Sequence, residues 1–588
     1  MDPSSRASWS FATTRLRVHT PLADAVRSRG IDARRAVVDC FFLSAVVVLS
    51  TSAYIGGLGF YLDDYAVLWR MNNARDQSLF GLYHAVYSGT GTRPLQAGLF
   101  ALLYRLFGLD PLGYHLVNAA LLVAIAVLLY LVLRELGLPR AVCIAVPLVY
   151  SMLPHYATER FWLDAFEISV STAFYLLSLY AGLRAVRSSA WAFGGWLTIA
   201  VAGIAGSLLS YEIAFPLFVL NLAIIWWASR QSQEAASNRG TPRLLAALAV
   251  GLVAAAVLKT AIVASHSQSG REIGFHGSAV HHYAYLVFGA FKINVGTYFV
   301  AFPYVLWWIF VHRLSAANAG VAAAVGLLAF AYLWRVARSD DRRFTTSGVW
   351  RRLVGAGVVA LVLGYSIFLV SSPFLFRSAG FDNRINAAAA LGLATALVGG
   401  LGWLARRLDA QYRDVAFAGG VACVAAAGAF VVATLGTYWT SAVKRQDAIM
   451  AAILSDARTI PAGGTFILDG ACPEVGPTPV FSDDADLAAA LKLQLHQRAP
   501  GRADVASDGL SVARGELVLT LRYADHAETR AYPLNRNLVV YDFVRRRVIR
   551  LNSAERARHY IARRSVVSCP PLRSFAWGFD PGRRWSGA

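Results

Sequence analysis

Long apolar runs separated by short charged loops dominate the first 440 residues of the chain. A run of about 20 apolar residues crosses a bilayer as a helix. The pattern predicts spans over residues 37–61, 113–133, 141–153, 166–183, 190–209, 214–228, 244–263, 317–333, 353–370, 387–404 and 415–437. The segment 265–313 mixes histidines and Lys292 with the apolar stretch 299–310, so it adds either no crossing or two. We therefore expect about 11–13 transmembrane helices.

Two parts of the chain depart from this pattern. Residues 79–108 carry His84, Arg93 and Arg105 among aromatic side chains, and we expect helices at the membrane surface rather than a span. After residue 440 the hydropathy falls to that of a soluble domain of about 150 residues, an ordinary domain size. This part has helical periodicity at 443–457 and 484–497, and strand composition at 466–468, 516–522 and 538–549, the last resembling a hairpin.

Composition supports a membrane protein. Hydrophobic residues make up 56% of the chain and charged residues 15%, and the mean hydropathy is +0.48. Soluble domains carry roughly a quarter charged residues, so a soluble enzyme is excluded. We expect an all-α polytopic membrane domain, residues 37–440, with a small C-terminal α+β domain, residues 441–588.

Charge predicts the orientation of the chain. The net charge of +20 comes almost entirely from arginine. Basic loops stay in the cytoplasm, so the arginine-rich tail 1–36 is predicted to be cytoplasmic, and no nucleic-acid partner is expected. An odd number of spans then places the C-terminal domain outside, in an oxidising compartment. Cys472 and Cys569 both lie in that domain, and a disulfide between them is compatible with this placement.

The strongest candidate for chemistry is the pair Asp63-Asp64, just beyond the first predicted span. Two carboxylates at a membrane surface are costly to dehydrate, so they face water, a cation or a substrate. One of them could accept a proton from an incoming hydroxyl while its neighbour orients that group or contacts a divalent cation. We favour Asp63 as the general base, with Asp64 second. The plain alternative is a solvated loop.

This pair resembles the catalytic signature of GT-C membrane glycosyltransferases, which include protein O-mannosyltransferases and the bacterial enzymes that transfer aminoarabinose to lipid A. Further similar motifs follow in order over residues 55–220: Arg93-Pro94-Leu95, residues 102–108 and 113–118, Pro154-His155 with Thr158-Glu159 and Trp162, and Ser210-Tyr211-Glu212 with Pro216. In the last motif Tyr211 stands where the family usually has lysine. The later spans and the C-terminal domain match no family motif.

The resemblance implies a polyprenyl-phosphate-linked sugar as donor and transfer with inversion at the outer membrane face. The acceptor would be an envelope glycan, lipid or protein. The leaving phosphate needs cations, for which Arg93, Arg160, Lys292, Arg377 and Arg384 are available, with Arg377 and Arg384 preferred because arginine binds phosphate through two donors. His155, Glu159 and Glu212 are further candidate polar groups at outer helix ends.

Two other functions fit parts of the pattern. A transporter or flippase of lipid-linked sugars would place its ionisable residues near mid-membrane, whereas here they gather at one face. A non-catalytic relative that acts as a scaffold would not need the aspartate pair. Histidines 266, 276, 281 and 282 have no spacing diagnostic of zinc, so we predict no zinc site there.

Overall fold

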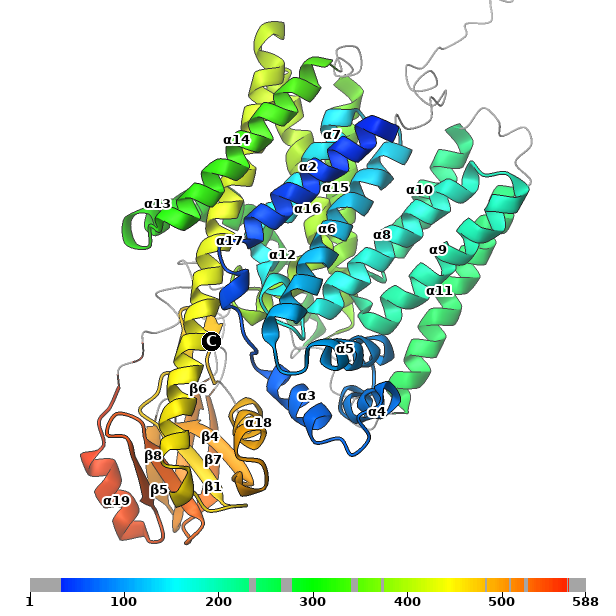
Figure 1. Cartoon of the computed structure of the whole chain (residues 1–588). Coiled ribbons are helices and arrows are strands. Elements are labelled where there is room, and N and C mark those ends of the chain that lie inside the picture. The colour runs from blue at the N-terminus through cyan, green and yellow to red at the C-terminus, as the bar shows by residue number, and fades with distance from the viewer. Residues whose placement is uncertain are drawn as a thin grey trace, which may run out of the picture.

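The chain forms a bundle of long apolar helices with a small α+β domain at one end (Figure 1). The computed structural model describes residues 33–231, 240–265, 278–339, 347–371, 375–481, 484–506, 509–522, 527–567 and 569. Most of the predicted tail 1–36, and also His266 and His276, lie outside these residues. We call residues 456–569 the α+β domain and the bundle end next to it the domain side.

The bundle has the length and composition of an integral membrane protein. Ten helices in the described ranges are long and apolar enough to cross a membrane, or eleven if a bent pair, Arg140–Met152 with Pro154–Arg160, is one span. This agrees with the lower end of the predicted number. The ten are α2 (Ala33–Thr51), α6 (Pro111–Glu135), α8 (Phe166–Val186), α9 (Ala190–Ser210), α11 (Gly240–Ala264), the continuous run of α12 (Ala279–Phe291), the π-helix η6 (Lys292–Ala301) and α13 (Phe302–His312), α14 (Ala316–Ser339), α15 (Ser347–Tyr365), α16 (Ala387–Ala405) and α17 (Ala410–Ser455). Helix α7 (Arg140–Met152) belongs to the bent pair, and α10 (Leu217–Gln231) is not among the ten.

The consecutive helices α12, η6 and α13 form most of the segment 265–313, whose path across the membrane the sequence left open. By length and composition they could form one crossing. Near their start, a ring nitrogen of His282 lies 2.8 Å from the carbonyl oxygen of Phe368, beyond the end of α15. Just after their end, the guanidinium of Arg313 lies over the ring of Tyr438 on α17. These two contacts attach the ends of the segment to neighbouring parts of the bundle, and whether the segment crosses the membrane stays a prediction.

Three short helices cover the domain side of the bundle (Figure 1): α3 (Asp63–Asn72), α4 (Leu79–Thr90) and α5 (Pro94–Phe107). The side chain of Ser78 caps α4 by accepting a hydrogen bond from the backbone N–H of Gly81, and Pro94 opens α5 at a position where no backbone donor is needed. These helices are too short to span a bilayer, as predicted for residues 79–108.

The α+β domain is built on a four-stranded sheet in the order β4-β1-β8-β9, with β1 parallel to both neighbours and β8-β9 an antiparallel hairpin. Strand β8 is buried along its whole length, as expected for an inner parallel strand. The strands are β1 (Thr465–Asp469), β2 (Glu474–Val475), β3 (Thr478–Pro479), β4 (Arg502–Ala506), β5 (Gly509–Ala513), β6 (Glu516–Arg522), β7 (Ala527–Pro533), β8 (Leu538–Asp542) and β9 (Arg547–Arg550), and the helices are α18 (Asp484–Leu495) and α19 (Ala554–Arg563). The predicted strands and the hairpin are confirmed.

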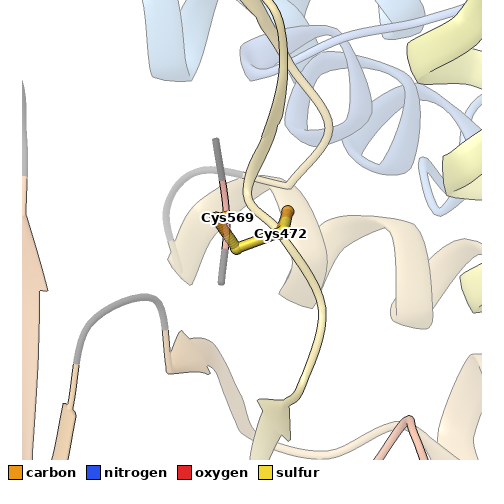
Figure 2. The surroundings of a disulfide bond; sticks show 2 residues. All are labelled: Cys472 and Cys569. Carbon is orange, nitrogen blue, oxygen red and sulfur yellow. A yellow bond between two sulfur atoms is a disulfide. The ribbon is translucent and has the colours of Figure 1, made fainter. Parts of the chain in front are cut away.

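A disulfide closes the α+β domain, and a long helix connects this domain to the bundle. Cys472, just after β1, is bonded to Cys569, beyond α19, as predicted (Figure 2). Helix α17 has 46 residues and continues past the predicted boundary at residue 440 without a break. At 1.5 Å per residue it is about 69 Å long, more than twice the thickness of a hydrocarbon core. The same helix therefore belongs to both parts of the protein.

Candidate active site

The two adjacent aspartates occupy different environments at the start of α3. The Asp64 side chain is buried, with 1% exposure. Its Oδ2 accepts a hydrogen bond from the backbone N–H of Tyr61 at 2.9 Å, and its Oδ1 accepts one from the backbone N–H of Asp164 at 3.0 Å. Asp63, in contrast, is exposed. Asp64 therefore fixes the loop, and Asp63 is the member of the pair that a substrate can reach.

The surroundings of Asp63 raise the pKa of its carboxyl group to about 6. The main cause is the displacement of water by the surrounding protein, and the nearby carboxylate of Asp164 adds to it. Three arginines, Arg384, Arg70 and Arg93, oppose this shift and favour the ionised form. At neutral pH the carboxylate is therefore mostly ionised, but it binds a proton more readily than an ordinary aspartate.

A second cluster of charges lies around Arg93. Its Nη1 lies 2.8 Å from Oε1 of Glu167, its Nη2 lies 3.8 Å from Oε1 of Glu212, and its guanidinium stacks on the Tyr211 ring at 4.3 Å. Lys259, on α11, approaches the other Glu212 oxygen at 3.0 Å. Burial opposes ionisation of Glu212, but Arg93 and Lys259 together hold the pKa of its carboxyl group below its usual value. Four separate segments thus converge on one cluster of ionisable side chains.

Arg384 reaches the site from a loop far along the chain. Its guanidinium lies over the ring of Trp162, 4.8 Å from the centroid. The loop is fixed to the turn η2 (Pro154–Arg160), where the Thr158 hydroxyl donates a 2.6 Å hydrogen bond to the carbonyl of Gly380. The segment after α7 and the loop before α16 are therefore held together, and this contact brings Arg384 near Asp63.

Three predicted site residues lie in the interior instead. His155 is fully buried, and its Nδ1 lies 2.7 Å from the hydroxyl of Tyr298. Glu159 and Arg160 are 0% and 3% exposed, and Arg160 donates a hydrogen bond to the carbonyl of Ser151. None of the three is among the groups that act on the charge of Asp63. The contacts of His155 and Arg160 connect η2 to η6 and to α7 and so help to hold η2 in position.

Arg377, predicted together with Arg384 as a phosphate contact, lies in a different cluster. Its Nη1 is 3.1 Å from Oδ2 of Asp382. Glu474 of the α+β domain lies close to both groups, and burial raises the pKa of its carboxyl group to about 7. Arg377 therefore faces the α+β domain, whereas Arg384 faces Asp63.

Sequence reasoning did not select Asp164, Arg70 or Lys259 as site residues. Asp164 lies two residues after Trp162, which belongs to one of the family-like motifs. This position next to the motif could have indicated that Asp164 belongs to the site. Arg70 lies seven residues after Asp63, about two helical turns, so it belongs to the same face of α3. Lys259 was visible only as a charge near the end of a predicted span.

An apolar groove of about 530 Å³ lies beside the Arg93 cluster. It is formed almost entirely by one face of α11 and is lined by Phe215, Leu252, Val253, Ala256, Val257, Thr260, Ala261 and Ala264. Phe215 follows Glu212 by three residues, which relates the groove to the Arg93 cluster, although Lys259 itself does not line the groove. No group of three or more metal-ligating side chains occurs in the described ranges.

Fold and site together define a polytopic membrane protein with an ionisable cluster at one bundle end, beneath an α+β domain. No protein-family model and no curated protein matches the chain.

Among solved structures, the chain is similar to ArnT from Cupriavidus metallidurans bound to undecaprenyl phosphate, with 16% identity over 78% of this chain and 88% of ArnT and a TM-score of 0.34. The apo form of ArnT gives 17% identity, 80% and 89% coverage and a TM-score of 0.33. An Archaeoglobus fulgidus oligosaccharyltransferase tethered to an acceptor peptide gives 13% identity over 73% of this chain, which spans 61% of that enzyme, and a TM-score of 0.34. These scores are low, and the likeness carries no statement about the function of this chain.

Proposed function

We propose that the protein is a membrane glycosyltransferase that moves a sugar from a polyprenyl-phosphate donor to a cell-envelope acceptor. The observation that carries this proposal is the environment of Asp63, an exposed carboxylate. The surrounding protein and Asp164 raise its pKa toward neutral pH, and three arginines lie near enough to act on its charge. A general base works best when its pKa lies near the working pH. The motifs at residues 55–220 support the same class of reaction.

In this mechanism Asp63 accepts the proton of an acceptor hydroxyl as that oxygen bonds to the anomeric carbon of the donor sugar. The bond from this carbon to the phosphate oxygen breaks, and its electron pair leaves with the polyprenyl phosphate. Attack opposite the leaving group inverts the anomeric carbon. Arg384 and Arg70 are the cations that would stabilise charge as it develops on the phosphate. Asp64 takes no proton and keeps the loop in place through its two backbone hydrogen bonds.

The lipid part of the donor would lie in the apolar groove along α11. The tail is already surrounded by lipid hydrocarbon, so the groove would orient it by van der Waals packing rather than by removing it from water. Lys259 and Arg93 pair with Glu212, three residues before the groove residue Phe215, and would be the cations nearest to a phosphate held there. If a divalent cation takes part, Asp63 and Asp164 would be the carboxylates that hold it, and it would supply positive charge for the phosphate. Loss of activity in EDTA, with recovery on adding Mg²⁺ or Mn²⁺, would favour it.

The reaction is proposed for the extracytoplasmic face, with the acceptor a glycan, a lipid or a protein. The basic loops and the disulfide support this orientation. A single cysteine at the exposed position Ser511, in a chain otherwise free of reactive cysteines, should react with a membrane-impermeant maleimide in intact cells. Labelling only after the cells are opened would place the site in the cytoplasm and remove the support for a lipid-linked donor.

The activity is tested by comparing envelope glycans, lipids and proteins by mass spectrometry in cells with and without the gene. A sugar present only with the gene identifies product and acceptor. Complementation with Asp63→Asn should leave that sugar absent while the protein is inserted at the normal level. Full modification by an Asp63→Asn, Asp64→Asn double variant would refute the assignment. An unchanged envelope together with altered distribution of lipid-linked sugar between leaflets would instead favour a transporter.

A further inference from the structure

Tyr61 and Tyr65, two residues before and two residues after Asp63, both contact helix α17. The hydroxyl of Tyr61 donates a hydrogen bond to the carbonyl of Trp439 at 3.0 Å, and their rings meet edge to face. The hydroxyl of Tyr65 donates to Oε1 of Gln446 at 3.2 Å. Trp439 and Gln446 are seven residues apart, about two helical turns, so they lie on the same face of α17. One helix face therefore holds the start of α3 at two points.

Gln446 also connects this loop to the α+β domain. Its side chain is 1% exposed, and its Nε2 donates a 2.7 Å hydrogen bond to the carbonyl of Val480. The ring of Phe481, the next residue, lies against the ring of Tyr65 at 5.9 Å between centroids. Both ends of the Gln446 amide are thus used, one on the loop that carries Asp63 and one on the α+β domain.

The backbone between the two attachment points is strained. Leu62, between Tyr61 and Asp63, has a φ of +48°. A leucine rarely adopts this left-handed conformation, which persists only where the surrounding structure enforces it. Since the turn at Leu62 determines where the first residue of α3 stands, the contacts that enforce it also determine the position of the Asp63 carboxylate.

A second contact between α3 and the α+β domain lies further along the helix. The ammonium of Lys492, on α18, lies over the Trp69 ring at 4.8 Å. The next residue, Leu493, belongs to the same apolar cluster as Leu68 and Met71 of α3. Helix α3 is therefore packed against the domain along its length as well as at its start.

We propose that Gln446 is a positioning residue for Asp63, and that the α+β domain, through Gln446, is part of the apparatus that holds the catalytic carboxylate. This inference rests on the proposed role of Asp63 as base. Gln446 does not touch substrate; it acts through Tyr65 and the turn at Leu62.

The test uses the full chain in lipid nanodiscs with the variants Gln446→Met, Tyr65→Phe and the double variant. The measured quantity is the initial rate of transfer of the sugar identified in the envelope comparison, with the cells' own lipid extract as donor. Each single variant should lower kcat by about tenfold with little change in KM for the donor, because small misplacement of a reacting group is costly. The double variant should be no slower than Gln446→Met, since the same hydrogen bond is removed.

A matched control exists at the other end of α3. There the hydroxyl of Tyr104 donates to Oδ1 of Asn72 at 3.1 Å, a bond of the same chemistry and nearly the same length. Tyr104→Phe removes this bond without touching the start of the helix. We expect it to leave kcat unchanged, with a thermal midpoint close to that of Tyr65→Phe.

Hydrogen–deuterium exchange gives a readout independent of catalysis. Exchange of residues 58–66 should become faster in Gln446→Met and Tyr65→Phe but not in Tyr104→Phe. Unchanged exchange, or faster exchange with an unchanged kcat, would overturn the positioning role. If instead Asp63→Asn were fully active, the proposed function would fail, whereas the exchange result would still report whether Gln446 holds the loop.

Discussion

Replacing the two adjacent aspartates one at a time should separate catalysis from folding. Asp63→Asn removes an exposed carboxylate, and Asp64→Asn changes a side chain that is 1% exposed and accepts two backbone hydrogen bonds. We expect the first variant to be inactive and as stable as the parent. The second should be destabilised and retain activity in the fraction that stays folded.

The size of the second effect follows from the two contacts of Asp64. An asparagine keeps one acceptor oxygen, but its NH₂ group must then face the backbone N–H of Tyr61 or of Asp164, where no hydrogen bond can form. A buried N–H left without an acceptor costs about 1–3 kcal/mol. By contrast, a substitution at an exposed position such as Asp63 usually changes stability by less than about 0.5 kcal/mol.

The assay combines a thermal unfolding midpoint in nanodiscs with the initial rate of sugar transfer per folded protein. The parent and both variants are compared at pH 7.5, where Asp63 is ionised in the parent. Equal losses of stability in the two variants would contradict the distinct environments assigned to the aspartates. Activity in Asp63→Asn combined with inactivity in fully folded Asp64→Asn would show that Asp64 is the base instead.

Three further outcomes are expected. Because the pKa of Asp63 is raised to about 6 and the base must be ionised, kcat/KM should fall as pH decreases through about 6. Asp164→Asn removes a neighbouring negative charge and should move this midpoint to lower pH. A flat profile between pH 5 and 8 would contradict the role of Asp63. Cys472 and Cys569 are 97 residues apart, so on the chain-entropy model reduction of their disulfide should lower the free energy of unfolding by about 4–5 kcal/mol, measured as a lower thermal midpoint. Cys472→Ser should abolish the gel shift that reduction causes in the parent. Lys259→Met should raise KM for the lipid donor more than it lowers kcat, and the opposite pattern would place Lys259 at the reacting atoms.

Local patterns predicted the elements of the fold well. A hydrophobic core of fixed thickness imposes a minimum length on each span, and this length is visible in sequence. The inner strands of a parallel sheet are buried on both faces, so Phe466–Leu468 form a continuous apolar run that could be recognised before the fold was known. In contrast, the segment of α12 and α13 mixes polar residues with a stretch as apolar as a span, so composition alone did not settle its path.

The site was predicted only as far as local motifs reach. The aspartate pair stood out because two charges follow an apolar run. Which of them is accessible depends on backbone donors from Tyr61 and from Asp164, and the latter lies 100 residues away in sequence. Gln446 is one polar residue in a helix, and nothing in its neighbourhood indicates that Tyr65, 381 residues earlier, hydrogen-bonds to it. Contacts of this kind arise from tertiary packing and leave no periodic signal.

The unbroken course of α17 has a consequence for how such a protein can change during evolution or be recombined in the laboratory. Between Trp439 and Ser455 the helix has no flexible joint, so one inserted residue would rotate everything beyond it by about 100° and shift it by about 1.5 Å. Chimeras that exchange the C-terminal part should therefore keep the length of this segment, because even seven inserted residues, which nearly restore the helical phase, would shift the α+β domain by about 10.5 Å from its contacts with α3.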